Sequence, residues 1–332
     1  MLVALRISDE DRFQTPSSVR LTLATLWQQL TRCNLLCAVI PFLWILITPT
    51  LLGEDRRSRQ EPQRSEIIRL NTSLVTIPVI VRDRSNRLMP GLSRGDFMVW
   101  EDGVRQEIVN FSSTEEPFNV ALLIDASPST RYWLNDIRKA ALDFVKQLQP
   151  KDRVMIVAFD ERVHFLGGFT SDRQELAHLI RSVKSSLATA LYDAIYRTIK
   201  EQLSSLTGRK ALVVFTDGVD TYSHQATSAS TLELVANSGI PCYAIQYWGG
   251  KSGDQFLRSL ADESGALHLR AGNIEKTSAA FALIAEELRH QYQLAYYPLN
   301  DQRDGRYRVI SVSVNQADLT VRARRGYRAS KD

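Results

Sequence analysis

Cysteine and histidine are scarce in this chain of 332 residues, and their positions exclude several kinds of site. The three cysteines (Cys33, Cys37 and Cys242) are too few for a disulfide framework, and none forms the CxxC pair of a zinc or redox site. The five histidines include no HExxH sequence, which excludes the commonest zinc-hydrolase signature. Chemistry that depends on thiolates or on paired imidazoles is therefore not indicated.

An excess of charge of one sign is also lacking. The 41 Lys and Arg residues nearly balance the 37 Asp and Glu residues, which leaves a formal net charge of +4. That excess is too small to require nucleic acid or an anionic membrane surface as a partner. The basic stretch at residues 303–331 lacks the interleaved aromatics of a base-stacking surface, so we interpret it as the solvated face of strands. We expect no nucleic-acid partner.

One long apolar run is present near the N-terminus. Residues 33–53 carry no charge and are mostly apolar, and a helix needs about 20 such residues to cross a bilayer. Two interpretations stay open: a retained transmembrane anchor, or the apolar core of an export signal. Arginines flank the run on both sides, and their count does not favour export. We expect membrane anchoring by a single N-terminal helix, or export, with the folded domain outside the cytoplasm. Residues 1–32 are a polar segment, and residues 54–70 are a charged linker.

Short apolar runs alternate with helical stretches across residues 118–290. The runs lie at 120–124, 154–159, 211–215 and 241–245. Apolar residues recur at helical spacing over 134–148, where Pro150 ends the pattern, and over 191–206. Continuous apolar strands separated by amphipathic helices predict an α/β fold with a doubly wound, mostly parallel sheet.

Two segments with the pattern of β-strands, residues 71–117 and 291–332, flank this domain. Residues 74–81 predict a strand, and Asp102-Gly103 predicts a hairpin between 96–100 and 104–111. Neither segment is long enough to bury a core alone, but their strand regions together make about 75 residues, near the size of a viable small domain. We predict one discontinuous β domain, and two unrelated hairpins stay open as the alternative.

Oxygen-bearing side chains follow two of the apolar runs. Asp125, Ser127 and Ser129 come after the run at 120–124, and Asp217 comes after the run at 211–215. Thr189 precedes a predicted helix. Ligands of open parallel sheets bind at the carboxyl ends of the strands. Two carboxylates and three hydroxyls, without imidazole or thiolate, suit Mg²⁺ above all, with Mn²⁺ and Ca²⁺ as alternatives.

Each of these loops taken alone is also an ordinary helix N-cap. Asp220 in particular fits the cap of the next helix along the chain. The metal interpretation depends on three such loops lying at the end of a predicted strand or the start of a helix.

The pattern resembles that of a von Willebrand factor type A (VWA) domain over residues 118–290. Asp125-x-Ser127-x-Ser129, Thr189 and Asp217 match the five positions of that family's metal-ion-dependent adhesion site, or MIDAS. The flanks at 79–112 and 290–327 resemble a bacterial VWFA-related, acidobacterial-type subfamily.

The resemblance implies a Rossmann-like fold and a role for each matched residue. Ser127, Ser129 and Thr189 would reach the metal through their hydroxyls, and Asp125 and Asp217 directly or through water. Asp220 and Gly218 would lie in the layer around these ligands. An Asp or Glu side chain of a protein partner would complete the coordination.

Three classes of function are compatible with these residues. The first is a non-enzymatic binding protein with an adhesion or assembly role, which we expect. A metal-dependent hydrolase would need a base near the metal, and the sequence offers only His224. In the third class, a structural subunit, the metal loops would only hold the fold.

Overall fold

The computed structural model describes residues 74–112, 116–247 and 251–331. The predicted N-terminal helix at 33–53, the segment 1–32 and the linker 54–70 lie outside these residues. Within the described ranges, no helix is both long and apolar enough to cross a membrane.

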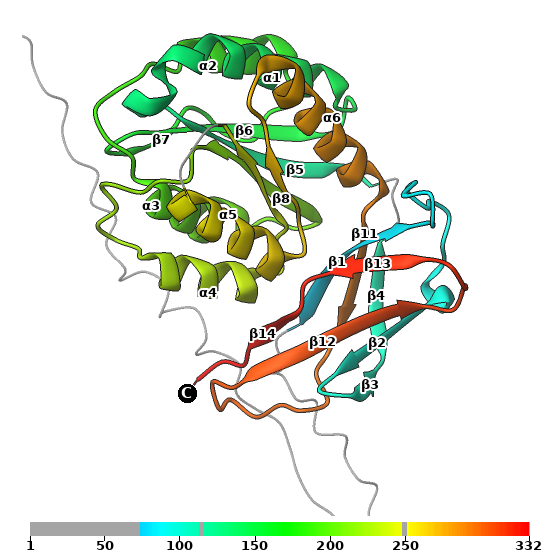
Figure 1. The fold of residues 1–332 in the computed structure, drawn as a ribbon. Helices are drawn as coiled ribbons and strands as arrows, with labels where there is room; N and C mark the ends of the chain where they lie inside the picture. The colour runs from blue at the N-terminus through cyan, green and yellow to red at the C-terminus, as the bar shows by residue number, and fades with distance from the viewer. Residues whose placement is uncertain (1–73, 113–115, 248–250, 332) are drawn as a thin grey trace, which may run out of the picture. The chain divides into compact units, whose positions relative to one another are not determined.

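Strands and helices follow one another along the chain as the sequence predicts (Figure 1). The strands are β1 (Val75–Arg82), β2 (Phe97–Glu101), β3 (Val104–Gln106), β4 (Ile108–Ser112), β5 (Phe118–Asp125), β6 (Arg153–Phe159), β7 (Val163–Phe165), β8 (Arg209–Thr216), β9 (Cys242–Gln246), β10 (His268–Arg270), β11 (Tyr292–Tyr296), β12 (Tyr307–Val314), β13 (Thr320–Ala323) and β14 (Gly326–Arg328). The helices are η1 (Arg94–Asp96), η2 (Pro128–Trp133), α1 (Leu134–Gln147), α2 (Arg173–Ser182), α3 (Leu191–Arg197), η3 (Thr198–Leu203), α4 (Ser228–Ser238), α5 (Lys251–Ser264) and α6 (Ile274–His290).

The central sheet has the order β10-β9-β8-β5-β6-β7 and is parallel except for β7 at one edge. Its middle strands are buried on both faces, as their continuous apolar runs require. Helices α1, α2 and α6 cover one face, and α3, α4 and α5 cover the other (Figure 1). The predicted doubly wound α/β fold is confirmed. The helix predicted over 191–206 differs in detail, because α3 continues into the π-helical η3, where Ser204 N donates to the Ile199 carbonyl.

Two four-stranded sheets, ordered β13-β1-β11-β4 and β14-β12-β2-β3, enclose a separate core. Each sheet combines strands from both sides of the α/β domain. Strand β1 pairs with β11 from Val75↔Tyr296 to Val79↔Tyr292, and β2 pairs with β12. The two β segments therefore form one sandwich whose halves are separated in sequence by the whole α/β domain.

The predicted hairpin has a shorter second arm than the sequence indicates. Asp102 and Gly103 have positive φ angles of 48° and 80°, which suits a tight turn. Only Val104–Gln106 then pairs with β2, because β4 (Ile108–Ser112) joins β11 in the other sheet. The expectation of one arm over 104–111 is wrong, since alternation along a chain cannot reveal a strand that changes sheet at a corner.

The interpretation of residues 303–331 as a solvated face is wrong for two of its arginines. Arg308 and Arg324 are only 4% and 2% exposed. Arg324 Nη1 donates to the carbonyl oxygen of Ala236 in α4 at 2.9 Å. Burial lowers the pKa of Arg324 to about 10, because it removes the guanidinium from water.

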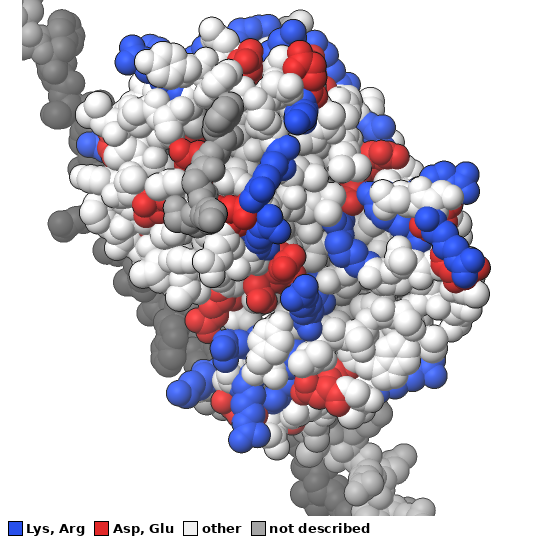
Figure 2. Space-filling view, viewed as in Figure 1, with Lys and Arg blue, Asp and Glu red and all other residues white. Residues whose placement is uncertain are grey.

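The buried carboxylate of Glu287 in α6 forms ion pairs with two arginines of the sandwich. Arg82 of β1 pairs with its Oε1 at 2.8 Å, and Arg322 of β13 pairs with its Oε2. These contacts join the sandwich to the α/β domain. On the face drawn in Figure 2, Lys and Arg likewise lie among Asp and Glu residues.

Arg209 connects the two points at which the chain enters and leaves the α/β domain. It is 3% exposed at the start of β8. Its guanidinium donates to the carbonyl of Glu116, just before β5, at 2.7 Å, and to the carbonyl of Leu288 near the end of α6. The two connections to the sandwich therefore lie side by side.

Candidate metal centre

Asp125 ends β5 in the middle of the sheet and is fully buried. Its Oδ1 accepts a hydrogen bond from Ser127 N at 2.8 Å, and its Oδ2 accepts one from the Thr216 hydroxyl at 2.6 Å. The chain continues from β5 to β6 on one side and returns with β8 on the other. Asp125 thus lies where the strand order reverses, which is where doubly wound sheets bind ligands.

The two serines after Asp125 bring their hydroxyls together. Ser127 is buried and Ser129 is exposed, and their hydroxyls form a hydrogen bond with the Oγ atoms 2.9 Å apart. Adjacent ligands of octahedral Mg²⁺ with bonds of 2.0–2.1 Å are separated by about 2.9 Å. The hydroxyl of Thr130 donates to the carbonyls of Asp125 and Ser127 at 3.0 and 2.8 Å, which fixes this turn.

Asp217 lies in the loop directly after β8, where it is half-buried. Its Oδ1 accepts from Val219 N at 2.9 Å. Gly218 has φ +85°, and a Cβ there would lie 2.8 Å from the carbonyl oxygen of Gly253 in α5. A Cβ on Gly253 would lie 2.5 Å from the carbonyl oxygen of Asp217. The Asp217 loop is therefore packed directly against the first turn of α5.

Thr189 lies in a segment that contacts both other loops. It is buried, and its N–H donates to the Thr221 hydroxyl at 3.0 Å. Its carbonyl accepts from the N–H groups of Thr221 and Tyr222 at 2.8 and 2.9 Å. Three residues earlier, Ser186 N donates to the Ala126 carbonyl at 2.8 Å. The structure thus brings together the three loops that hold all five candidate ligands.

Asp220 does not cap the next helix along the chain. Its Oδ1 accepts from Tyr192 N in the first turn of α3 at 3.1 Å and from the Ser223 hydroxyl at 2.6 Å. Helix α4 has its own N-cap, because the Thr227 hydroxyl accepts from Ser230 N at 3.2 Å. Asp220 therefore connects the Asp217 loop to the helix that follows Thr189.

The electrostatics of the centre favour a bound cation. Burial raises the pKa of Asp125 to about 6, and the nearby charge of Asp217 adds to the rise, while hydrogen bonds from Ser127 and Thr216 oppose it. In the described part of the chain, neither carboxylate forms an ion pair with Lys, Arg or His. Among the residues that the structure describes, no three or more His, Cys, Asp and Glu side chains form a group that could hold a metal ion. A cation here would use hydroxyl as well as carboxylate oxygens, a donor set that fits Mg²⁺.

Residues 119–283 match the von Willebrand factor type A domain family. The α/β domain of this chain belongs to this family. The VWA resemblance is confirmed for this domain, whereas the narrower subfamily stays a prediction. No curated protein matches the chain.

Solved structures of similar fold share little sequence with the chain. BatB from Bacteroides thetaiotaomicron is 17% identical, with 52% of this chain and 97% of that chain covered and a TM-score of 0.44. The vWF domain of the type V pili tip protein Mfa5 from Porphyromonas gingivalis is 14% identical, with 51% and 94% covered and a TM-score of 0.45. A von Willebrand factor type A protein from Catenulispora acidiphila is 12% identical, with 79% and 75% covered and a TM-score of 0.48.

Each of the three loops of the VWA domain also carries one large exposed apolar side chain. Tyr132 is 88% exposed, Leu187 is 84% exposed and Tyr222 is 46% exposed. Tyr132 lies three residues after Ser129 in η2, and such residues share one side of a 3₁₀-helix. Leu187 lies two residues before Thr189, and Tyr222 N donates to the Thr189 carbonyl. These three residues are called the apolar rim below.

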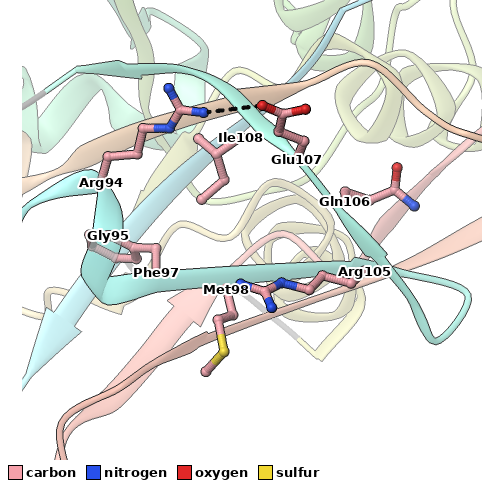
Figure 3. Close-up of a pocket in the computed structure, with 8 residues that line it drawn as sticks. All are labelled: Arg94, Gly95, Phe97, Met98, Arg105, Gln106, Glu107 and Ile108. Carbon is pink, nitrogen blue, oxygen red and sulfur yellow. Dashed lines mark ion pairs between the residues drawn. The ribbon is translucent and has the colours of Figure 1, made fainter.

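A separate cavity of about 560 Å³ lies at an edge of the sandwich, away from the VWA loops (Figure 3). Arg94, Arg105 and Glu107 are among its lining residues, and Arg94 Nη2 lies 3.7 Å from Glu107 Oε1. Residues of η1, β2, β3 and β4 supply its walls. No pattern in the sequence indicates this cavity.

Several residues that support the centre were not identified from the sequence. Thr216 donates a hydrogen bond to Asp125. In the sequence, its position directly before Asp217 is the feature that could indicate this role. Asp193 is buried and accepts from the N–H groups of His224, Gln225 and Ala226 at 2.7–3.0 Å, which orders the chain after the Asp217 loop. No local pattern distinguishes Asp193 from an ordinary helix residue.

Proposed function

We propose that this VWA domain binds a divalent cation, with Mg²⁺ as the preferred ion, and that the bound ion captures an acidic side chain of a protein partner. The convergence of the three loops at the reversal point of the sheet carries this proposal. Two carboxylates without a described counter-ion and a pair of hydroxyls 2.9 Å apart lie at that point. Leaving such a buried charge uncompensated is costly, so a cation is the natural complement.

The residues of the three loops have distinct roles at this site. Ser127, Ser129, Asp125, Asp217 and Thr189 would hold the ion. Bound Mg²⁺ would supply a positive charge with a coordination position that a carboxylate can fill. The fixed backbone of the three loops keeps the donors in place before the partner arrives, which lowers the entropic cost of binding.

The apolar rim supports a protein as the partner. VWA domains generally mediate protein–protein interactions. Exposed tyrosine and leucine side chains around a polar centre provide the buried area that a carboxylate alone lacks. We therefore propose a partner whose Asp or Glu is flanked by apolar residues.

We further propose a binding role rather than catalysis. His224, the only base that the sequence offers, is exposed, and its ring lies against Tyr222 at 4.6 Å. Its backbone N–H donates to Asp193 Oδ2 at 2.9 Å, and no hydrogen bond joins its ring to a candidate ligand among the described residues. We also propose presentation outside the cytoplasm through residues 33–53, as an anchor or after export.

The test is a comparison of the wild-type chain with Asp217→Ala. Isothermal titration with Mn²⁺ should show one site in the wild type and none in the variant. A pull-down with the wild type should capture a partner in Mg²⁺ but not in EDTA, while circular dichroism shows that both proteins stay folded.

Two results would contradict the proposal. If the wild type binds neither Mn²⁺ nor Mg²⁺, the proposed metal site is wrong. Metal-dependent hydrolysis of ester or phosphate substrates, lost in Asp217→Ala, would replace binding with catalysis.

A further inference from the structure

A chain of side-chain hydrogen bonds reaches the Asp217 loop from behind. Gln246 Nε2 donates to the carbonyl oxygen of Asp217 at 3.2 Å. The Oε1 of the same amide lies 2.9 Å from Nε2 of His268. Gln246 ends β9 beside the end of β8, and His268 begins β10. These two residues are neither candidate ligands nor part of the loops that supply them.

The direction of these bonds follows from their chemistry. A backbone carbonyl only accepts, so the NH₂ of Gln246 must face Asp217 and its oxygen must face His268. His268 Nε2 must then carry a hydrogen and donate it. Burial lowers the pKa of His268, so a neutral ring with its hydrogen on Nε2 fits this arrangement. The ring thereby fixes which way the buried amide points.

Both residues are held on rigid elements. Gln246 is only 4% exposed, and its own carbonyl accepts from Ala271 N at 2.8 Å. His268 is held by its place in β10, where it pairs with Ala244 of β9. On the other side of the loop, the backbone of Gly253 in α5 contacts Gly218. The Asp217 loop is thus located by α5 on one side and by β9 and β10 on the other.

We propose that Gln246, oriented by His268, is a positioning residue that sets where Asp217 presents its carboxylate to the candidate metal centre. This inference rests on the proposed metal function. The Asp217 side chain is folded back onto Val219 N of its own loop, so the backbone position decides where the carboxylate lies. Loss of the bond from Gln246 would release the carbonyl at the base of that loop.

The first measurement compares Mn²⁺ affinity of the purified chain with that of Gln246→Met, which keeps the side-chain length but cannot donate. Removing a partner that orients a metal ligand costs about 10- to 100-fold in affinity, and we expect that loss here. Gln291→Met is the matched control, because Gln291 is also 4% exposed but lies outside the VWA loops. That variant should bind Mn²⁺ as the wild type does.

His268 provides the test of orientation. His268→Leu removes the donor and should weaken Mn²⁺ binding about fivefold, the worth of one ordinary hydrogen bond. His268→Gln retains an N–H donor and should restore most of that loss. Equal effects of Leu and Gln would overturn the role given to His268.

Hydrogen exchange in EDTA separates this inference from the metal function. The amides of Gly218 and Val219 should exchange faster in Gln246→Met than in the wild type or in Gln291→Met. Unchanged exchange, or Mn²⁺ affinity that falls equally in both methionine variants, would overturn the positioning role. If the wild type binds no Mn²⁺, the proposed metal function fails, and exchange at these two amides still decides whether Gln246 holds the loop.

Discussion

Thr216 donates its hydroxyl hydrogen to Asp125 at 2.6 Å, so the last residues of the neighbouring strands β8 and β5 are joined by their side chains. The same hydroxyl oxygen accepts from Gly218 N at 3.0 Å. One side chain therefore fixes both the buried carboxylate and the loop that follows Asp217. The spacing between the two acidic residues of the centre depends on this threonine.

Thr216→Val should weaken Mn²⁺ or Mg²⁺ binding by about 10- to 100-fold, because the change keeps the shape but removes a bond that orients a ligand. Isothermal titration measures this effect. Thr198→Val is the control, since Thr198 is buried and its hydroxyl has no partner among the described residues. Equal affinity in Thr216→Val and the wild type would show that Asp125 needs no support from β8.

Asp125→Asn should have opposite effects with and without metal. In EDTA the variant should melt at the wild-type temperature or higher, because a buried carboxylate without a counter-ion is removed. With Mg²⁺ at 100 times its Kd the wild type should gain about 2.7 kcal/mol of stability, and the variant should gain none. Calorimetric melting in EDTA and in Mg²⁺ measures both effects. A gain of the same size in both proteins would place the ion elsewhere.

Replacing the apolar rim should separate partner capture from metal binding. Tyr132→Ser and Leu187→Ser should each weaken capture of the metal-dependent partner by about 1 kcal/mol or more, roughly fivefold. Mn²⁺ affinity should stay at the wild-type value, because neither side chain is a candidate ligand. Tyr297→Ser is the control, because it removes a tyrosine of the sandwich that is 53% exposed and lies outside the apolar rim. If the rim variants capture the partner as well as the wild type does, the apolar rim does not contribute to partner binding.

Glu287→Ala should destabilise the chain by about 3 kcal/mol, the lower end of the cost of removing one partner from a buried ion pair. The lower end applies because Arg82 and Arg322 stay partly exposed and regain water. Urea unfolding measures the change. Glu286→Ala, one residue earlier and exposed, should alter stability by no more than about 0.5 kcal/mol. A similarly small effect of Glu287→Ala would mean that these ion pairs contribute little to the contact between the sandwich and the α/β domain.

The α/β fold could be predicted from sequence because each of its signals is local. Runs such as 120–124 and 211–215 are continuously apolar, and the helices between them have clear spacing, so parallel strands follow. The position of Asp125 and Asp217 after two such runs placed them at one edge of the sheet. The metal itself stays a prediction, as does the role of residues 33–53.

The supporting contacts could not be predicted because they join residues that are distant in sequence. Gln246 and His268 meet the Asp217 loop only when three parallel strands align. Arg324 and Glu287 have the charges of surface residues, and nothing near them in the sequence indicates that folding buries them. The contact of Asp220 with α3 is hidden for the same reason, since its partner Tyr192 precedes it on another element.

The bond from Arg209 to both connections has a consequence for the order of folding. During synthesis β1 to β4 emerge long before β11 to β14 exist, so their edges stay unpaired in the meantime. A folded VWA domain holds its two ends together through the carbonyls of Glu116 and Leu288. Pairing of Val75 with Tyr296 then requires closure of a much shorter loop than one that spans most of the chain. We therefore expect the folded VWA domain to favour assembly of the sandwich, and a slow-folding variant of it to leave the strand edges outside it unpaired for longer.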